Sequence, residues 1–247
     1  MFSRRSIRPR LIRWPALVAS AAAVASTVIF SGIASSGTSA QTTDHSTGTT
    51  DGLSGPKPTI VLEHGAWADA SSWTGTIAIL QAEGYTVDAP PNPLRGLSED
   101  SGYLANYLKN ISGPVVLVGH SYGGAVITDA ASGNPNVKAL VYVDAFIPAA
   151  NQSLGQLLSP QSCLAGAGVD PTKVFQFVQD PALPPEDVDA YALTQATSLY
   201  PGLQQCFAGG FPSWQASELA AAQRPIALGA LTESRDHQHG PRFPRGP

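Results

Sequence analysis

The segment Pro114-Val-Val-Leu-Val-Gly-His-Ser-Tyr-Gly-Gly124 decides the fold expected for this chain of 247 residues. It begins with a short apolar run rich in β-branched residues, which is typical of a buried strand. After the turn, an Ala, Val and Ile segment of helical character continues to about Gly133. A strand, a tight turn with Ser121 at its tip and a helix form the setting in which G-x-S-x-G presents a serine side chain.

The residues around Ser121 fit such a turn. Strand and helix nearly touch there, so Gly119 and Gly123 have to be small, and Gly124 lets the helix approach the sheet. The N-terminus of the helix also directs its free N–H groups toward the serine. The alternative is a chance G-x-S-x-G in a chain with 24 glycines, but the clean strand before the motif and the helix after it argue against chance. We therefore interpret Ser121 as a nucleophile.

The sequence on either side alternates between strands and helices. Strands are expected at 58–63, 85–89 and 137–144, and helices from about 69 to 83 and from Ser98 onward. Single helices between consecutive strands predict an α/β fold, with a parallel sheet covered on both faces. The side chains expected to face the sheet are Trp73, Ile77 and Leu80 on the first helix, and Leu104, Tyr107, Leu108 and Ile111 on the second.

The alternation stops after Phe146. Residues 149–225 are rich in proline, and short helices are expected after Asp170, between 185 and 198, and from 214 to 223. We expect these residues to form a helical cap inserted over the edge of the sheet where ligands bind in open α/β folds. A separate small helical domain is the alternative, but so short a segment has little core of its own.

Residues 1–40 are expected to be a signal peptide. Five arginines and no acidic residue precede an apolar, Ala-rich stretch, and small residues suit cleavage after Ala40. The pair Arg4-Arg5 resembles a twin-arginine export signal. A retained membrane anchor is the alternative. We favour cleavage of the signal peptide, which predicts a secreted, extracellular protein without a stable membrane anchor.

Charge and composition narrow the range of partners. Cleavage would remove five of the 14 basic residues and none of the 18 acidic ones, which leaves a net charge of −9. No basic patch is then left, so nucleic acid is not an expected partner. The five histidines and two cysteines show no metal-ligand spacing, so no metal is expected. Residues 41–57, rich in Thr, Gly and Ser, are expected to be a flexible polar leader.

Export also bears on the two cysteines. An oxidising compartment favours a disulfide between Cys163 and Cys206, and two buried free thiols are the alternative.

Taken together, the motifs resemble the α/β-hydrolase superfamily, and more closely its small bacterial esterase-like members, plant methylesterases and hydroxynitrile lyases. The resemblance covers about residues 58–232 and rests on His64-Gly-Ala-Trp67, Gly119-His-Ser-Tyr-Gly-Gly124 and Leu140-Val-Tyr-Val-Asp-Ala-Phe146. It implies a serine hydrolase that acts on a small-molecule carboxylic ester through an acyl-enzyme on Ser121, without a cofactor.

The resemblance implies roles for other residues as well. The backbone N–H groups of Ala66 and Tyr122 would form the oxyanion hole, and Asp144, at the end of the fourth strand, is the candidate acid. His64 and His120 are interpreted as structural, His120 because it would point the wrong way to be the base. The same scaffold also carries lyases, so the alternatives are a hydroxynitrile-lyase-like enzyme and a catalytically inactive ligand-binding remnant of a hydrolase.

The superfamily places further strands, an acidic loop and a histidine downstream of the serine. Here the only downstream histidines are His237 and His239, inside residues 234–247, a polar stretch expected to be disordered. The sequence therefore predicts a C-terminally incomplete hydrolase domain over 58–233, and we hypothesise a truncated or frame-shifted product whose activity is in question. Its open sheet should expose an apolar edge and promote aggregation.

Overall fold

The computed structural model describes residues 55–164, 170–179, 181, 184, 187–196 and 201–235. The chain divides into two compact units, and every described residue belongs to the second, Gly52–Pro247. The predicted signal peptide, most of the predicted leader, and His237 and His239 lie outside the described residues. Among the described helices, none has both the length and the apolar character needed to cross a bilayer.

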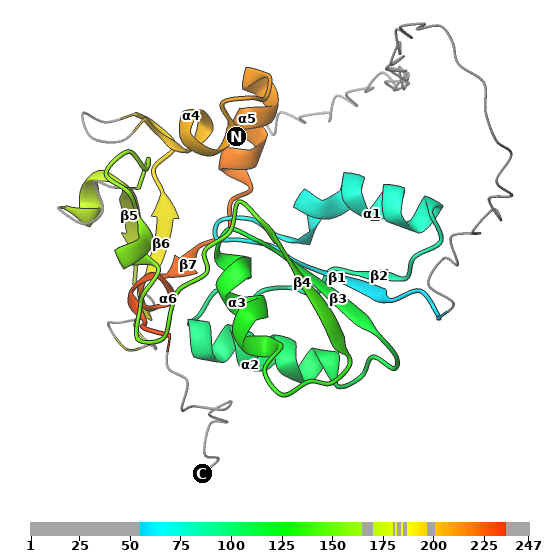
Figure 1. The fold of residues 1–247 in the computed structure, drawn as a ribbon. Helices are drawn as coiled ribbons and strands as arrows, with labels where there is room; N and C mark the ends of the chain where they lie inside the picture. The colour runs from blue at the N-terminus through cyan, green and yellow to red at the C-terminus, as the bar shows by residue number, and fades with distance from the viewer. Residues whose placement is uncertain are drawn as a thin grey trace, which may run out of the picture. The chain divides into compact units, whose positions relative to one another are not determined.

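A four-stranded parallel sheet forms the centre of the described unit (Figure 1). Its strands are β1 (Thr59–Glu63), β2 (Val87–Asp88), β3 (Val115–His120) and β4 (Val137–Val143), in the order β2-β1-β3-β4. The two inner strands, β1 and β3, carry most of the buried apolar residues of the sheet, as expected for a sheet covered on both faces. The predicted parallel α/β fold is therefore confirmed.

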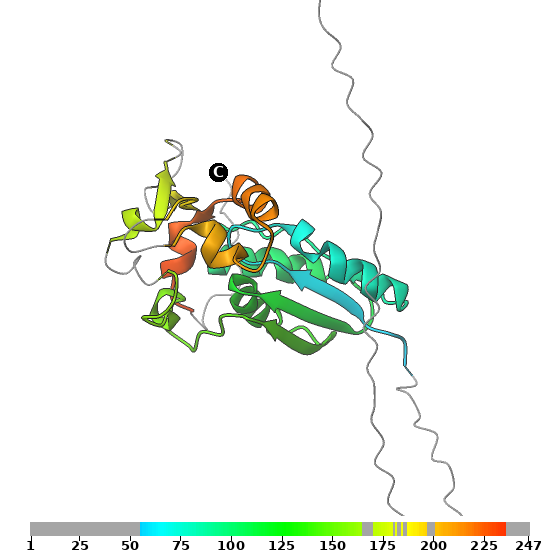
Figure 2. The same cartoon turned by 90° about the horizontal axis from the view of Figure 1, so that it is seen from above.

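Helices cover both faces of this sheet. The helix α1 (Thr74–Ala82), which follows the 3-10 turn η1 (Ala70–Trp73), lies on one face, and α2 (Leu97–Leu108) and α3 (Tyr122–Ala130) lie on the other (Figures 1 and 2). From β1 the chain crosses to β2 at one edge of the sheet. It then crosses in the opposite direction, past β1 to β3 and on to β4. Right-handed connections therefore place α1 opposite the other two helices.

The two helices predicted from spacing cover the sheet to different extents. Leu104 and Leu108 of α2 are 1% exposed, so the predicted stripe on this helix packs into the core. No residue of α1 is fully buried. The remaining side chains of the two predicted stripes are half-buried: Trp73, Ile77, Leu80, Tyr107 and Ile111.

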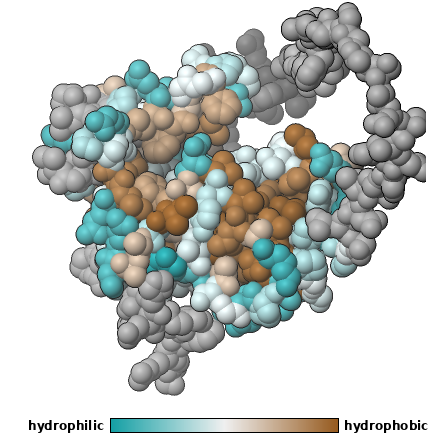
Figure 3. Space-filling model, viewed as in Figure 1, coloured by the Kyte–Doolittle hydropathy of each residue, from teal (hydrophilic) through white to brown (hydrophobic). Residues whose placement is uncertain are grey.

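The strand β4 leaves apolar side chains in contact with solvent. Val141 is 43% exposed and Val143 is 39% exposed. Figure 3 shows apolar side chains gathered over the part of the molecule where β4 lies in Figure 1. Because exposed apolar strand surface favours association between molecules, this region bears on solubility.

The cap differs from the expected set of short helices, because it contains a small antiparallel sheet. The strands β5 (Phe175–Val178), β6 (Asp189–Ala192) and β7 (Ile226–Ala227) pair in the order β5-β6-β7. The helix predicted between 185 and 198 is therefore wrong at 189–192. The segment Asp-Ala-Tyr-Ala is too short to show a period, and it becomes a strand because partners on both sides satisfy its backbone groups.

The helical parts of the cap are short. The helix predicted from 214 to 223 is present as α5 (Ser213–Ala221), and α4 (Leu203–Ala208) was not predicted. After Asp170 the expected helix is only the 3-10 turn η4 (Pro171–Lys173). The described part of the chain also contains η2 (Gly155–Leu157) and α6 (Leu228–Thr232).

Residues at the borders of the two segments expected to be flexible contact the domain. Ser234 forms an antiparallel bridge with Ser153, and the guanidinium group of Arg235 pairs with the carboxylate of Asp129. At the other end, the ammonium group of Lys57 lies 4.7 Å from the centre of the Tyr85 ring. These partners are distant in sequence, and for that reason polar composition alone did not reveal them.

Candidate active site

Ser121 has the strained backbone expected of a serine at the tip of a strand-to-helix turn. It lies between β3 and α3 with φ +52° and ψ −122°. A residue other than glycine in such a conformation costs about 1–3 kcal/mol and persists only where the surrounding structure holds it. The predicted turn geometry is therefore present.

Close packing around the turn explains its glycines. A Cβ added at Gly123 would lie 2.6 Å from the carbonyl oxygen of Glu63, because α3 begins directly against the end of β1. A Cβ added at Gly65 would lie 2.8 Å from the Cβ of Ser121. Real Cβ atoms do not approach other atoms so closely, so both positions require glycine. The loop after β1 thus touches the candidate nucleophile.

Two main-chain hydrogen bonds place Asp144 beside this turn. The N–H of Ser121 donates to the carbonyl oxygen of Val143 over 3.3 Å, and the N–H of Phe146 donates to the carbonyl oxygen of Ser121 over 3.0 Å. Asp144 lies between these two anchors, with φ +42°, and its side chain is exposed and lines the same cavity as Ser121. The candidate acid is therefore near the serine.

The two residues predicted for the oxyanion hole also lie at this cavity. Ala66 follows Gly65 in the loop after β1, and Tyr122 is the first residue of α3. The first N–H groups of a helix have no acceptor within the helix, and they lie at the positive end of its dipole. Ser121, Ala66 and Tyr122 thus come together from the loop after β1 and the turn that begins α3.

His64 is held on both sides of its ring. Asn92 donates its backbone N–H to Nε2 of His64 over 3.0 Å, so Nδ1 carries the proton and donates to the carbonyl oxygen of Gly65 over 2.9 Å. Burial lowers the pKa of His64, which keeps the ring neutral. Its two nitrogens are used in fixing the loop after β1, in agreement with the structural role predicted for it.

His120 lines the cavity together with Ser121 and Asp144. Its ring meets the edge of Trp73 at a centroid distance of 6.4 Å. Burial lowers the pKa of His120, and the charge of Asp144 opposes this shift. Within the described part of the chain, no hydrogen bond joins Ser121 to a histidine. Reasoning from the sequence did not foresee that His120 would lie at the cavity.

A buried pair of carboxyl groups lies behind the turn. The hydroxyl group of Tyr122 donates to Oδ2 of Asp100 over 2.6 Å, and the backbone N–H of Arg95 donates to Oδ1 over 3.0 Å. Burial raises the pKa of Asp100 to about 6, although these hydrogen bonds lower it. Glu63 is 1% exposed, and burial together with the charge of Asp100 raises its pKa well above the ordinary value. The side chain of Tyr122 is thus fixed from inside the domain.

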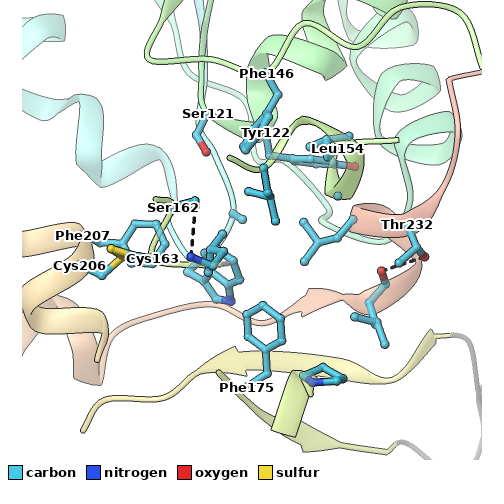
Figure 4. Close-up of a pocket in the computed structure, with 18 of the residues that line it drawn as sticks. Ser121, Tyr122, Phe146, Leu154, Ser162, Cys163, Phe175, Cys206, Phe207 and Thr232 are labelled. Carbon is cyan, nitrogen blue, oxygen red and sulfur yellow. Dashed lines mark hydrogen bonds between the residues drawn. A yellow bond between two sulfur atoms is a disulfide. The ribbon is translucent and has the colours of Figure 1, made fainter. Parts of the chain in front are cut away.

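The cavity in front of Ser121 has a volume of about 490 Å³. Figure 4 shows Ser121 at one end and Phe175 at the other, with Phe207 and the cysteines on one side and Leu154 and Thr232 on the opposite side. Among the described residues that line it, Asp144 is the only one with a charged side chain. The size falls within the range of pockets that bind small molecules, and the lining suits an uncharged, apolar ligand.

The two cysteines form part of the cavity wall. Cys163 and Cys206 are joined as a disulfide with a Cα–Cα distance of 5.9 Å, as predicted. Among the described side chains, no group of three or more His, Cys, Asp or Glu residues could hold a metal ion.

The position of the cavity follows from the topology. From β1 the chain crosses to β2 on one side, whereas from β3 it crosses to β4 on the other. The carboxyl ends of β1 and β3 therefore form the switch point at which open α/β sheets bind ligands. A serine in a strained strand-to-helix turn at this point defines a protein of the α/β-hydrolase type.

Comparison with known proteins agrees with this class. The chain belongs to the alpha/beta hydrolase family, since the sequence profile of that family matches residues 60–246. It is 38% identical over 111 residues to a carbendazim hydrolyzing esterase of Nocardioides sp., which covers 40% of this chain and 46% of that protein. It is 34% identical over 104 residues to a pyrethroid hydrolase of Sphingobium wenxiniae, with 36% of each chain covered. The matched segments thus span less than half the length of these relatives.

Solved structures share the fold. An extracellular alpha/beta-hydrolase from a Paenibacillus species has a TM-score of 0.51 and 22% identity, with 74% of this chain and 72% of that chain covered. Polyneuridine aldehyde esterase has a TM-score of 0.53 and 19% identity, with 73% and 74% covered. At these identities the likeness concerns the fold alone.

Proposed function

We propose that the chain is a serine hydrolase that cleaves small, uncharged carboxylic esters through an acyl-enzyme on Ser121. The observation that carries the proposal is the strained backbone of this serine at an apolar cavity of about 490 Å³. Strain of this kind persists where the surrounding structure enforces it, and it clusters at active sites. Two relatives named as an esterase and a pyrethroid hydrolase support the choice of ester hydrolysis.

In the proposed reaction, the hydroxyl oxygen of Ser121 attacks the carbonyl carbon of the ester, and a base takes its proton. The backbone N–H groups of Ala66 and Tyr122 stabilise the negative charge that develops on the carbonyl oxygen. The alcohol leaves with the proton. Water then attacks the acyl carbon and gives a proton to the base, the bond to the Ser121 oxygen breaks, and the proton returns to Ser121 as the carboxylic acid leaves.

Asp144 is the acid in this proposal, because the main-chain bonds of Val143 and Phe146 hold it beside the serine. Three histidines are to be tested as the base. His120 lines the same cavity, and His237 and His239 lie outside the described residues.

Hydrolysis of p-nitrophenyl acetate, butyrate and hexanoate by the mature chain tests the proposal. Substitution Ser121→Ala should lower kcat by about 10⁴-fold or more, because the nucleophile is lost. Substitution Ser162→Ala is the matched control, since this serine also lines the cavity but accepts a hydrogen bond from the backbone N–H of Leu164. Equal rates for the wild type and Ser121→Ala would contradict the proposal.

The apolar lining of the cavity favours a second function, which is binding of a hydrophobic small molecule without chemistry. Trp67 lies at the cavity, so its fluorescence should respond to a bound ligand. A chain that binds apolar esters in such a titration, with equal affinity in Ser121→Ala and without turnover, would have this function instead.

We also infer that the protein works outside the cytoplasm. The disulfide between Cys163 and Cys206 supports an oxidising compartment. Fusion of residues 1–40 to a reporter that is active only after export tests this inference, and Arg4→Lys with Arg5→Lys should abolish export if the signal is of the twin-arginine type.

A further inference from the structure

Trp67 connects the loop after β1 to the cap. It directly follows Ala66, whose backbone N–H is one of the two proposed oxyanion donors. We propose that Trp67 is a positioning residue that ties the loop of Ala66 to the cap strand β6, so that the cap sets the geometry of the oxyanion hole. This inference rests on the proposed function of Ser121.

The side chain of Trp67 is fixed by cap residues. Its Nε1–H donates to the carbonyl oxygen of Ala190 in β6 over 3.0 Å, and the residue is only 8% exposed. Its ring stacks on Phe175 at a centroid distance of 5.7 Å and meets Phe207 at 5.3 Å. A directed hydrogen bond and two ring contacts leave the indole a single orientation.

The main chain of Trp67 is fixed as well. Its φ of +59° lies in the left-handed region, which is unfavourable for a bulky side chain. Its carbonyl oxygen accepts the backbone N–H of Arg224, three residues after the end of the cap helix α5, over 3.3 Å. The cap therefore holds both the side chain and the backbone of Trp67 in a conformation that a free loop would leave.

The other side of Ala66 is anchored to the sheet. Gly65 lies against Ser121, and His64 is held by Asn92. Ala66 thus lies between Gly65, which packs against Ser121, and Trp67, which the cap holds. An oxyanion donor acts only within about 2.7–3.1 Å of the developing charge, so a small shift of Ala66 lowers the rate.

Substitution Trp67→Phe tests the proposal, because it keeps an aromatic ring but removes the N–H donor to Ala190. With p-nitrophenyl acetate, whose acyl group is too small to need the far end of the cavity, kcat per titrated active site should fall about three- to tenfold. KM should change less than twofold. The matched control is Trp214→Phe on α5, where the side chain is 64% exposed, and this variant should match the wild type.

Hydrogen exchange of the mature chain gives a second measurement that needs no activity. Backbone amides of residues 64–67 should exchange faster in Trp67→Phe than in the wild type or in Trp214→Phe. Should Trp67→Phe not fold, Trp67→Tyr also lacks the indole N–H and fills more of the space.

Each outcome decides the matter. Faster exchange with a lower kcat supports the positioning role. A higher KM with unchanged kcat and unchanged exchange makes Trp67 a wall of the cavity and overturns it. If the wild type proves inactive, the proposed function fails, and the exchange of 64–67 still shows whether Trp67 holds the loop.

Discussion

Asp100 is expected to make the stability of the domain fall as the pH rises. Burial raises its pKa from the ordinary 3.8 to about 6, even though Tyr122 and Arg95 donate hydrogen bonds to the carboxyl group. The folded state therefore keeps the proton of Asp100 over a pH range in which the unfolded chain has lost it. The protonated carboxyl group of Asp100 contributes fully to the free energy of unfolding below about pH 4, and this contribution is lost as the pH rises through about 6.

The size of the effect follows from the shift. A difference of about two pKa units corresponds to about 3 kcal/mol in the free energy of unfolding. Urea unfolding gives the free energy of unfolding of the wild type and of Asp100→Asn at each pH from 4 to 8. The difference between the two proteins should change by about 3 kcal/mol over this range. Glu63, whose pKa is also raised by burial, acts in the same direction in both proteins. Because the charge of Asp100 adds to that shift, the difference between the two proteins also includes the change at Glu63.

The control for this experiment is Glu218→Gln, because this carboxyl group lies exposed on α5. Its curve should run parallel to that of the wild type. If Asp100→Asn also runs parallel to the wild type from pH 4 to 8, the buried carboxyl group does not titrate as argued, and the reasoning about the interior behind the serine is wrong.

Four further outcomes are expected. Gly123→Ala should destabilise the fold by about 1–3 kcal/mol in thermal unfolding, because its Cβ would lie 2.6 Å from the carbonyl oxygen of the last residue of β1. Gly75→Ala, with open space around it in α1, should instead raise the melting temperature slightly. Reduction of Cys163–Cys206, which lie 43 positions apart, should cost about 4 kcal/mol in urea unfolding under otherwise equal conditions. Val141→Thr on the exposed strand β4 should lower the aggregated fraction in light scattering, and an unchanged fraction would show that this surface does not drive association.

The central layer was predictable because its signals are local. The run from Val115 to Gly124 carries the strand, the turn and the start of the helix within ten residues, and chemistry requires small residues there. The parallel direction of the strands followed from the single helices between them. Ser121 was found in the same way, whereas the roles of Ala66, Tyr122 and Asp144 followed from the resemblance to the hydrolase family. All four residues lie at the cavity.

The cap was predicted less well because its structure depends on partners far away in the sequence. Residues 189–192 form a strand only through pairing with β5 and β7. The order of Ser234 and Arg235 depends on contacts with Ser153 and Asp129. The hydrogen bond between Trp67 and Ala190 spans 123 positions, and no local pattern marks it.

The buried carboxyl group of Asp100 was missed for a related reason. It falls in the first turn of α2, where an acidic residue is ordinary at a helix N-terminus. Only the packing of α2 against α3 brings it to the hydroxyl group of Tyr122.

Labelling by a fluorophosphonate, read as intact mass on the chain without residues 1–40, tests most directly the claim that Ser121 is an activated nucleophile. An activated Ser121 should give one adduct per molecule, no adduct in Ser121→Ala, and a normal adduct in Ser162→Ala. Folded wild-type protein that remains unlabelled, or an adduct that persists in Ser121→Ala, would show that Ser121 is not the activated nucleophile.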